Sequence, residues 1–248
     1  MKRTLCFAKR NLKEIVRDPL SAGFGVVLPI TLLILLTIIN GNIPKEAKNN
    51  MFEISMLAPG IGVFGLGFIA LFAALLMSKD RSSSFMLRLY TSPMTGGDFI
   101  LGYALPLLPL GVVQLVCCFA AAIALGLSVS VNLLVCIFVC LPIMVVNIAI
   151  GLICGTLLNE KAVGGLCGAL LTNVTAWLSG CWFSLDLLGA GFRRFAYILP
   201  FANAVDAARA AVDGRFSDVP GKLWVVCAWA VGLTALAVVI FTRRKKLK

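Results

Sequence analysis

A polar stretch at residues 77–99 concentrates the side chains best suited to binding another protein (MSKDRSSSFMLRLYTSPMTGGDF). In a short helix, Arg81, Phe85 and Arg88 would fall on one face, because residues three or four apart lie above one another. Leu89 lies beside them. Three serines between Arg81 and Phe85 can cap a helix start, and a proline and two glycines after Leu89 can end one. Two arginines around an aromatic ring and a leucine are typical of a docking surface, and we predict one here.

The sequence offers few residues suited to metal binding or catalysis. The chain has no histidine, which excludes imidazole metal ligation and histidine acid–base catalysis. It has no GxxxxGK[ST] loop, so it cannot hydrolyse ATP by itself in the P-loop manner. No pair among the nine cysteines has the CxxC spacing of a zinc or redox site, and Cys136 and Cys140 are one helical turn apart. We interpret the cysteines as small apolar packing residues.

The elements around the polar stretch are strongly apolar. The 248 residues are 60% hydrophobic and 13% charged, where a soluble domain carries about 25% charged residues. Asp, Glu, Lys and Arg are absent from five windows, and one of them, residues 99–159, is long enough for two helices of about 20 residues. We therefore predict an all-α membrane protein with one transmembrane domain over residues 1–248. Its six predicted spans are 20–39, 56–77, 99–127, 133–158, 165–183 and 223–241.

Two flanking segments are amphipathic. Residues 1–19 combine an apolar stripe with an adjoining cationic face, which predicts a helix lying in the membrane interface. The alternative is an ordinary positively charged flank that only sets the topology. Residues 184–222 are too apolar for a free loop and too charged to span, so we expect short interfacial or re-entrant helices on the outer side. The predicted membrane-surface cations are Lys2, Lys9, Arg10, Lys13 and Arg17.

The positive charges predict the orientation. If both ends lie on one side of the membrane, that side receives 15 of the 22 Lys and Arg residues. Cytoplasmic loops carry the excess of these residues. We predict that both termini are cytoplasmic.

Small residues recur four apart at Gly151 and Gly155, and again at Gly164 and Gly168. Such a pattern lets membrane helices approach closely. In so glycine-rich a chain it is weak evidence of oligomerisation.

The chain resembles the membrane subunits of ABC-2 type exporters over its whole length. The amphipathic N-terminal segment is similar to the family's connecting helix, and Asp80 stands where the family more often has Glu before a basic residue. The matching residues after the second span are Lys79-Asp80-Arg81, Leu89, Thr91, Ser92, Pro93, Met94 and Phe99-Ile100-Leu101-Gly102. Those near the end are Leu199-Pro200, Asp206, Arg209 and Gly214, before a last span and a basic tail.

The resemblance implies that residues 79–93 form a coupling helix, seated in a groove of a separate ATP-binding subunit. It further implies two such subunits and a second membrane subunit, identical or homologous, in a bacterial cytoplasmic membrane. ATP and Mg²⁺ would be bound by the partner ATPase, and no cofactor by this chain, which would not itself be an enzyme. The implied contact residues are Asp80, Arg81, Phe85, Arg88, Leu89, Thr91 and Pro93.

Polar residues inside the spans could serve the cargo or the packing. Buried polar groups in membranes form interhelical hydrogen bonds or line a pathway, and both interpretations stay open. Few Tyr or Trp residues occur in the span interiors, which favours a hydrophobic or amphipathic cargo (drug, lipid or peptide antibiotic) over a sugar polymer. The candidate pathway residues are Gln114, Asn147, Thr172, Asn173 and Thr175.

The competing hypothesis is an ion-driven carrier or a channel that works without an ATPase. Such proteins often show internal symmetry and ionisable residues at the membrane midplane, and neither feature is evident in the sequence. An intramembrane enzyme would need a catalytic pair inside a span, which is also missing. The net charge of +11 lies on the predicted cytoplasmic flanks, where topology and anionic lipid explain it without nucleic acid.

Overall fold

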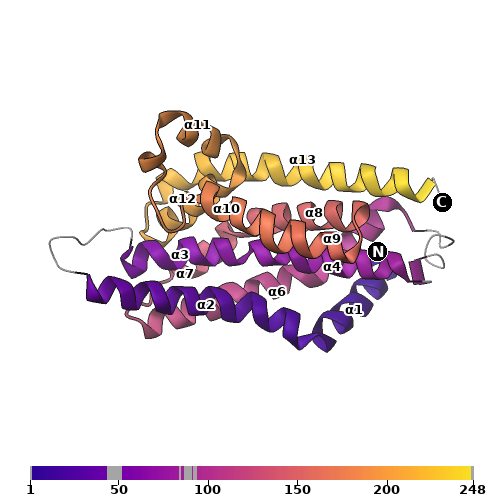
Figure 1. Cartoon of the computed structure of the whole chain (residues 1–248), viewed down its shortest axis with the longest axis horizontal. Helices are drawn as coiled ribbons and strands as arrows, with labels where there is room; N and C mark the ends of the chain where they lie inside the picture. The colour runs from indigo at the N-terminus through magenta and orange to yellow at the C-terminus, as the bar shows by residue number, and fades with distance from the viewer. Residues whose placement is uncertain (1, 44–51, 84, 87–90, 92–93, 247–248) are drawn as a thin grey trace.

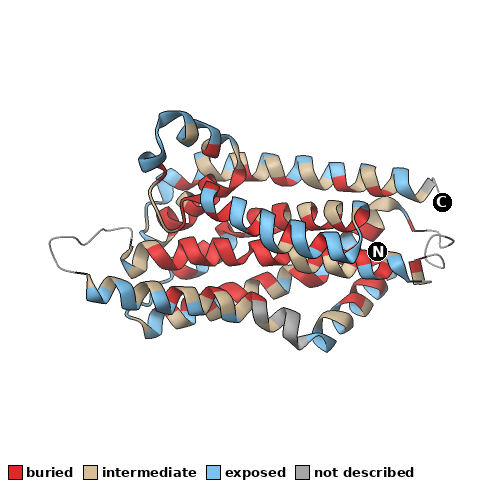
Figure 2. Cartoon of the chain, in the orientation of Figure 1, coloured by how far each residue is buried: buried red, intermediate tan, exposed pale blue. Residues whose placement is uncertain are grey.

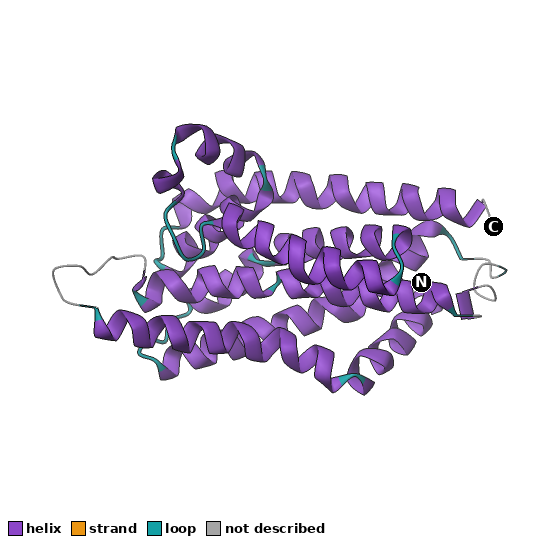
Figure 3. Cartoon of the chain, viewed as in Figure 1, coloured by secondary structure: helices purple, strands orange, loops and turns teal. Residues whose placement is uncertain are grey.

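The computed structural model describes residues 2–43, 52–83, 85–86, 91 and 94–246. This part of the chain contains helices and loops but no strand (Figure 3). Six helical stretches are long and apolar enough to cross a membrane, which confirms the predicted all-α, six-span fold. The spans are α2 (Pro19–Asn42), α3 (Ile54–Gly65) with α4 (Gly67–Ser82), α6 (Gly96–Ala124), α7 (Asn132–Val139) with α8 (Leu141–Leu157), α9 (Glu160–Val163) with a π-helix (Gly164–Leu171) and α10 (Thr172–Ser179), and α13 (Val219–Lys246).

The spans run side by side along the long axis of the molecule (Figure 1). Helix α1 (Lys2–Arg17) begins and α13 ends at the same end of the bundle, which we call the terminal end. The remaining short helices gather at the opposite end: a 3₁₀ turn (Leu185–Leu188), α11 (Ala190–Ile198), α12 (Pro200–Val212) and a second 3₁₀ turn (Phe216–Asp218).

The second predicted span is two helices that meet at Leu66. The neighbouring Gly65 lies so close to α6 that a Cβ there would come within 2.1 Å of Gln114 Nε2. That amide also donates to the carbonyl of Gly62 at 3.5 Å. A polar side chain that approaches a glycine-rich turn this closely is a recognised cause of a helix break.

The fourth and fifth spans are also interrupted. Helix α7 gives way to α8 at Cys140, and Pro142 occupies the first turn of α8. Proline fits a first helical turn but cannot continue a helix from the turn before it. The fifth span ends at Ser179, four residues before the predicted boundary, because Gly180 adopts a left-handed conformation with φ of 64°.

The centre of the bundle is the α3–α4 span, which is mostly buried, whereas few of the described residues of α2 and α13 are fully buried (Figure 2). Helices α4 and α8 touch backbone to backbone. A Cβ on Gly151 would lie 2.2 Å from the carbonyl oxygen of Ala70, and one on Gly155 would lie 2.6 Å from that of Ala74. The first of the two glycine pairs is thus used to pack one span on another within the chain.

The other glycine pair has room around it. A Cβ at Gly164 would meet nothing within 4 Å, and one at Gly168 would make an ordinary contact with Leu71. The two pairs have the same spacing in the sequence but different surroundings.

Most of helix α12 is buried in the bundle, at its residues 200–205 and 207–211, and its interfacial or re-entrant position stays a prediction. Arg209 fastens it there: the guanidinium donates to the carbonyl of Met56 at 3.2 Å, and to those of Gly180 and Cys181 at 3.1 Å each. Helix α11 is more exposed, at Arg193, Arg194 and Phe195 among others.

Candidate partner-docking site

Four elements meet at the terminal end around one aromatic cluster. Phe7 of α1 lies edge-on to Tyr103 of α6, with ring centroids 4.9 Å apart, and 5.8 Å from Phe99 of the same helix. Phe99 in turn lies 4.9 Å from Phe241 of α13. Phe7 can reach this position because residue 102 is a glycine: a Cβ there would lie 2.3 Å from the Phe7 ring.

A buried ion pair fastens the last turn of α4 to the same cluster. Arg10 of α1 donates to Asp80 Oδ2 at 2.6 Å, and the hydroxyl of Tyr103 donates to the same oxygen at 2.9 Å. The residue Asp80 is only 4% exposed. Asn11 of α1 completes the join by donating from Nδ2 to the carbonyl of Gly102 at 3.0 Å. Helices α1, α4 and α6 are therefore held together by charge-assisted hydrogen bonds.

Arg81 faces a different neighbour. Its guanidinium donates to the carbonyls of Thr156 and Leu158, the latter at 2.8 Å. These carbonyls lie at the C-terminal end of α8, where backbone acceptors lack helical partners and a cation is favoured. Asp80 and Arg81, adjacent in the sequence, thus join α4 to α1 and to α8 respectively.

The start of α6 is held by both ends of the chain. Thr95 and Asp98 form a capping box, and Thr4 of α1 donates to Asp98 Oδ1 at 2.8 Å. From the other side, Lys245 of α13 donates to the carbonyl of Met94 at 2.9 Å, and its ammonium lies 5.4 Å from the centre of the Phe99 ring. The segment that leads into α6 is thereby clamped between the first and the last helix.

The predicted contact residues divide into three groups. Asp80 and Arg81 turn toward the protein interior. Phe85 is half-buried, with its ring centroid 6.4 Å from that of Phe7 and the guanidinium of Arg10 at 4.3 Å, while Thr91 is exposed. The others lie outside the described residues: Arg88, Leu89 and Pro93. Residues 79–82 are the last turn of α4, not the beginning of a separate helix.

Helix α1 has a buried face that its sequence pattern did not predict. Thr4, Phe7, Ala8 and Asn11 face the protein, while the apolar residues Leu5, Leu12 and Val16 stay exposed. In the sequence, Thr4 and Asn11 look like part of a solvent-exposed face, because the pattern of α1 does not reveal their partners on α6. Among the predicted surface cations, Lys9, Lys13 and Arg17 are exposed, Arg10 is half-buried in the ion pair, and Lys2 is described only by its backbone.

Each of the candidate pathway residues donates a hydrogen bond to a backbone carbonyl. Gln114 bonds across to α3, as described above. Asn147 donates to Ile143 in its own helix at 3.0 Å, and the exposed Asn173 donates to Ala169 at 2.7 Å. The buried hydroxyls of Thr172 and Thr175 donate to carbonyls of their own span at 2.9 Å each. Gln114 thus makes an interhelical hydrogen bond, and a cargo role for all five residues stays a prediction.

The fold and this site define a polytopic helical membrane protein whose spans are joined at one end by a charged and aromatic cluster. Comparison with known protein families shows which family of membrane proteins the chain matches. The family model for ABC-2 type transporters matches residues 3–212, which is most of the chain. The protein belongs to the ABC-2 type transporter family. No curated protein matches the chain.

Membership of this family has direct consequences. The chain is a multi-pass membrane permease subunit of the ABC type, a transporter subunit and not a catalytic domain. The family implies association with an ABC ATP-binding subunit, and its usual setting is the bacterial plasma membrane. Within the described ranges, no group of three or more Cys, Asp or Glu residues is placed to hold a metal ion.

Proposed function

We propose that this protein is the membrane subunit of an ATP-driven exporter that moves a hydrophobic or amphipathic substrate (a drug, lipid or peptide antibiotic) out of the bacterial cell. Two ATP-binding subunits would dock at the terminal end of two membrane subunits, identical or homologous. ATP and Mg²⁺ would be held by those partners and not by this chain.

The proposal rests on the cluster of charged and aromatic side chains that joins the helices at the terminal end. Arg10, Asp80 and Tyr103 bring three helices to one carboxylate, and Phe99 and Lys245 add α13. A force applied to the segment between α4 and α6 would reach four elements together, because close-packed interiors transmit displacement and do not absorb it. This is the property required of a surface through which a partner's motion reaches the spans.

Two of the predicted contact residues already have partners within the chain. We propose that Asp80 and Arg81 hold the docking segment in place from the inside, because their side chains are already engaged with α1, α6 and α8. Direct contact with the ATPase would then fall to Phe85, Thr91, and the sequence-predicted Arg88, Leu89 and Pro93. The exposed Lys9, Lys13 and Arg17 lie at the same end and would face anionic lipid headgroups.

The charges also support the orientation. Exposed cations on α1 (Lys9, Lys13, Arg17) and at the end of α13 (Arg243, Arg244) share the terminal end. We therefore propose that this end is cytoplasmic, where an ATP-binding subunit is available.

Co-purification with the candidate ATPase tests the proposal. The wild-type chain and an Arg88→Glu variant would each be co-expressed with the ATPase and extracted in mild detergent. We expect the ATPase to accompany the wild type and to be reduced at least tenfold with Arg88→Glu. Arg194→Glu makes the same change of charge on the exposed α11 at the opposite end, and it should retain the ATPase.

Two results would contradict the proposal. If no ATPase accompanies even the wild-type chain, the ATP-driven mechanism fails, and an ion-driven carrier becomes the better hypothesis. If Arg88→Glu and Arg194→Glu reduce the recovered ATPase equally, docking does not occur at the terminal end. Gel-filtration profiles of both variants would show whether either has lost its fold.

A further inference from the structure

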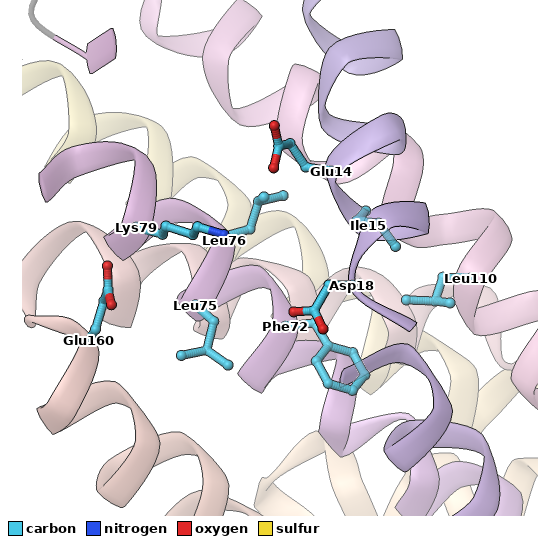
Figure 4. A pocket seen from close by; sticks show the side chains of 9 residues that line it. All are labelled: Glu14, Ile15, Asp18, Phe72, Leu75, Leu76, Lys79, Leu110 and Glu160. Atoms are coloured by element: carbon cyan, nitrogen blue, oxygen red, sulfur yellow. The ribbon is translucent and has the colours of Figure 1, made fainter. Parts of the chain in front are cut away.

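A cavity of about 180 Å³ lies between α1, α4, α6 and α9, next to the helices that the Arg10–Asp80 ion pair joins (Figure 4). Its inner wall is apolar and includes Phe72, Leu76 and Leu110. Cavities of roughly 150 Å³ bind benzene, so there is room here for one aromatic ring or a comparable apolar group. The cavity shares no lining residue with the docking contacts proposed above.

The rim of the cavity is acidic. Glu14 and Asp18 lie on the α1 side and Glu160 on the opposite side, with Lys79 of α4 between them (Figure 4). Three carboxylates against one ammonium give the lining residues a formal charge of −2, and the Arg10 guanidinium, 3.6 Å from Glu14, brings the sum to −1. The rim is thus negative on a chain that carries +11 overall, which matches a cationic ligand.

Two of the three carboxylates, those of Glu14 and Glu160, keep capacity for a ligand. Glu14 Oε1 is 3.6 Å from an Arg10 nitrogen, and Glu160 accepts from Ser82 at 3.1 Å. An ionised carboxylate offers about four acceptor positions, so one such contact does not saturate it. Asp18, Lys79 and Glu160 are exposed, which means that the cavity opens to the surface at its charged rim.

We propose that this cavity binds a hydrophobic cation, which places its apolar group against Phe72, Leu76 and Leu110 and its charge at the carboxylate rim. Burial of the apolar group supplies affinity, and the carboxylates select the sign of charge. The ring of Phe72 can add a cation–π attraction. An anionic amphiphile would fit the same wall but would meet repulsion at the rim.

The interpretation of this cavity as the loading site of an exporter rests on the proposed function. It narrows the substrate class of that exporter to amphipathic cations. Binding itself needs no ATPase. A failure of the binding experiment would leave the co-purification result untouched, and a failure of co-purification would leave a binding site on a protein of another mechanism.

The test compares two ions of the same shape and opposite charge. Tetraphenylphosphonium and tetraphenylborate would be equilibrated with the purified full-length chain in phosphatidylcholine nanodiscs, and empty nanodiscs would supply the background. We expect saturable binding of the cation, at least tenfold tighter than that of the anion. Raising the salt concentration should weaken binding of the cation, because the rim is exposed and therefore screened.

Substitutions locate the binding. Neutralising all three carboxylates (Glu14→Gln, Asp18→Asn and Glu160→Gln together) should weaken binding of the cation about 30-fold or more, at roughly threefold to tenfold for each partly exposed charge. Lys79→Gln removes the opposing ammonium and should tighten binding of the cation about twofold to fivefold. The matched control, Asp218→Asn, removes an exposed carboxylate at the opposite end and should change nothing.

The gain with Lys79→Gln keeps the test decisive if the triple variant fails to fold, since a misfolded chain does not bind more tightly. Equal binding of the two ions, no gain with a folded Lys79→Gln, or undiminished binding by a folded triple variant would each overturn the proposal.

Discussion

The carboxylate of Asp80 accepts hydrogen bonds from two residues that lie far from it in the sequence, Arg10 and Tyr103. Removing Arg10 leaves the buried carboxylate of Asp80 without its cation, which costs more than the pair itself contributes. The pair should therefore matter for stability in a way that an exposed pair does not.

A double-mutant cycle tests this at the scale of single residues. Arg10→Ala, Asp80→Ala and the double variant should give a coupling energy of about 1–3 kcal/mol. The free energies of unfolding would be measured by SDS titration, followed by tryptophan fluorescence.

The chain supplies a matched control for this cycle. Arg193 and Asp186 are also separated by 2.6 Å, but their side chains are 54% and 66% exposed, against 32% and 5% for Arg10 and Asp80. The exposed pair should couple by less than about 1 kcal/mol. Equal coupling in the two pairs would show that burial does not strengthen the Arg10–Asp80 interaction.

The contact between α4 and α8 decides how the central helices fit together. Gly151 of α8 meets the carbonyl of Ala70, and neither backbone can withdraw without moving its whole helix. A methyl group at this position has no space, whereas one at Gly164 has open surroundings.

Gly151→Ala should therefore destabilise the chain by about 1–3 kcal/mol, the usual cost of overpacking. Gly164→Ala, with the same change of side chain, should be neutral or slightly stabilising because alanine favours a helix. Thermal unfolding in detergent would compare the two. If both variants unfold at the wild-type temperature, α4 and α8 are not in the close contact described.

At this scale the sequence predicts the existence of elements better than their interruptions. Charge-free windows are enough to place six spans, because a membrane excludes charge over a fixed length. The break at Leu66 depends on a tertiary neighbour, the side chain of Gln114. The break at Cys140 has a local cause in Pro142, but the charge-free window alone does not mark it. The two glycine pairs have the same spacing in the sequence, and only their tertiary neighbours distinguish them.

The candidate site shows the same division. The polar stretch at residues 77–99 is recognisable because it interrupts an apolar chain. The inward direction of Asp80 and Arg81 was not predictable, since a helical wheel gives a residue's face but not the neighbour that covers it. Thr4 and Asn11 were missed because their value lies in partners on α6, roughly 90 residues away.

For the molecule as a whole, the expected orientation can be measured directly. Ser217 is exposed at the end opposite the termini, and Cys6 is exposed on α1. In a Cys6→Ser background, Ser217→Cys should react with a membrane-impermeant maleimide in intact cells. The native Cys6 should react only after the cells are permeabilised. The reverse pattern would place both termini outside and would contradict the proposed docking of a cytoplasmic ATPase.

The clamp that Thr4 and Lys245 form on the start of α6 has a practical consequence for anyone who handles the protein. An affinity tag or fluorescent fusion at either terminus would sit beside the surface that a partner is proposed to cover. Such an addition would compete with assembly, and the loss could be mistaken for an inactive transporter. A tag on the ATPase, or an epitope inserted near Ser217 at the opposite end, would leave the terminal end free.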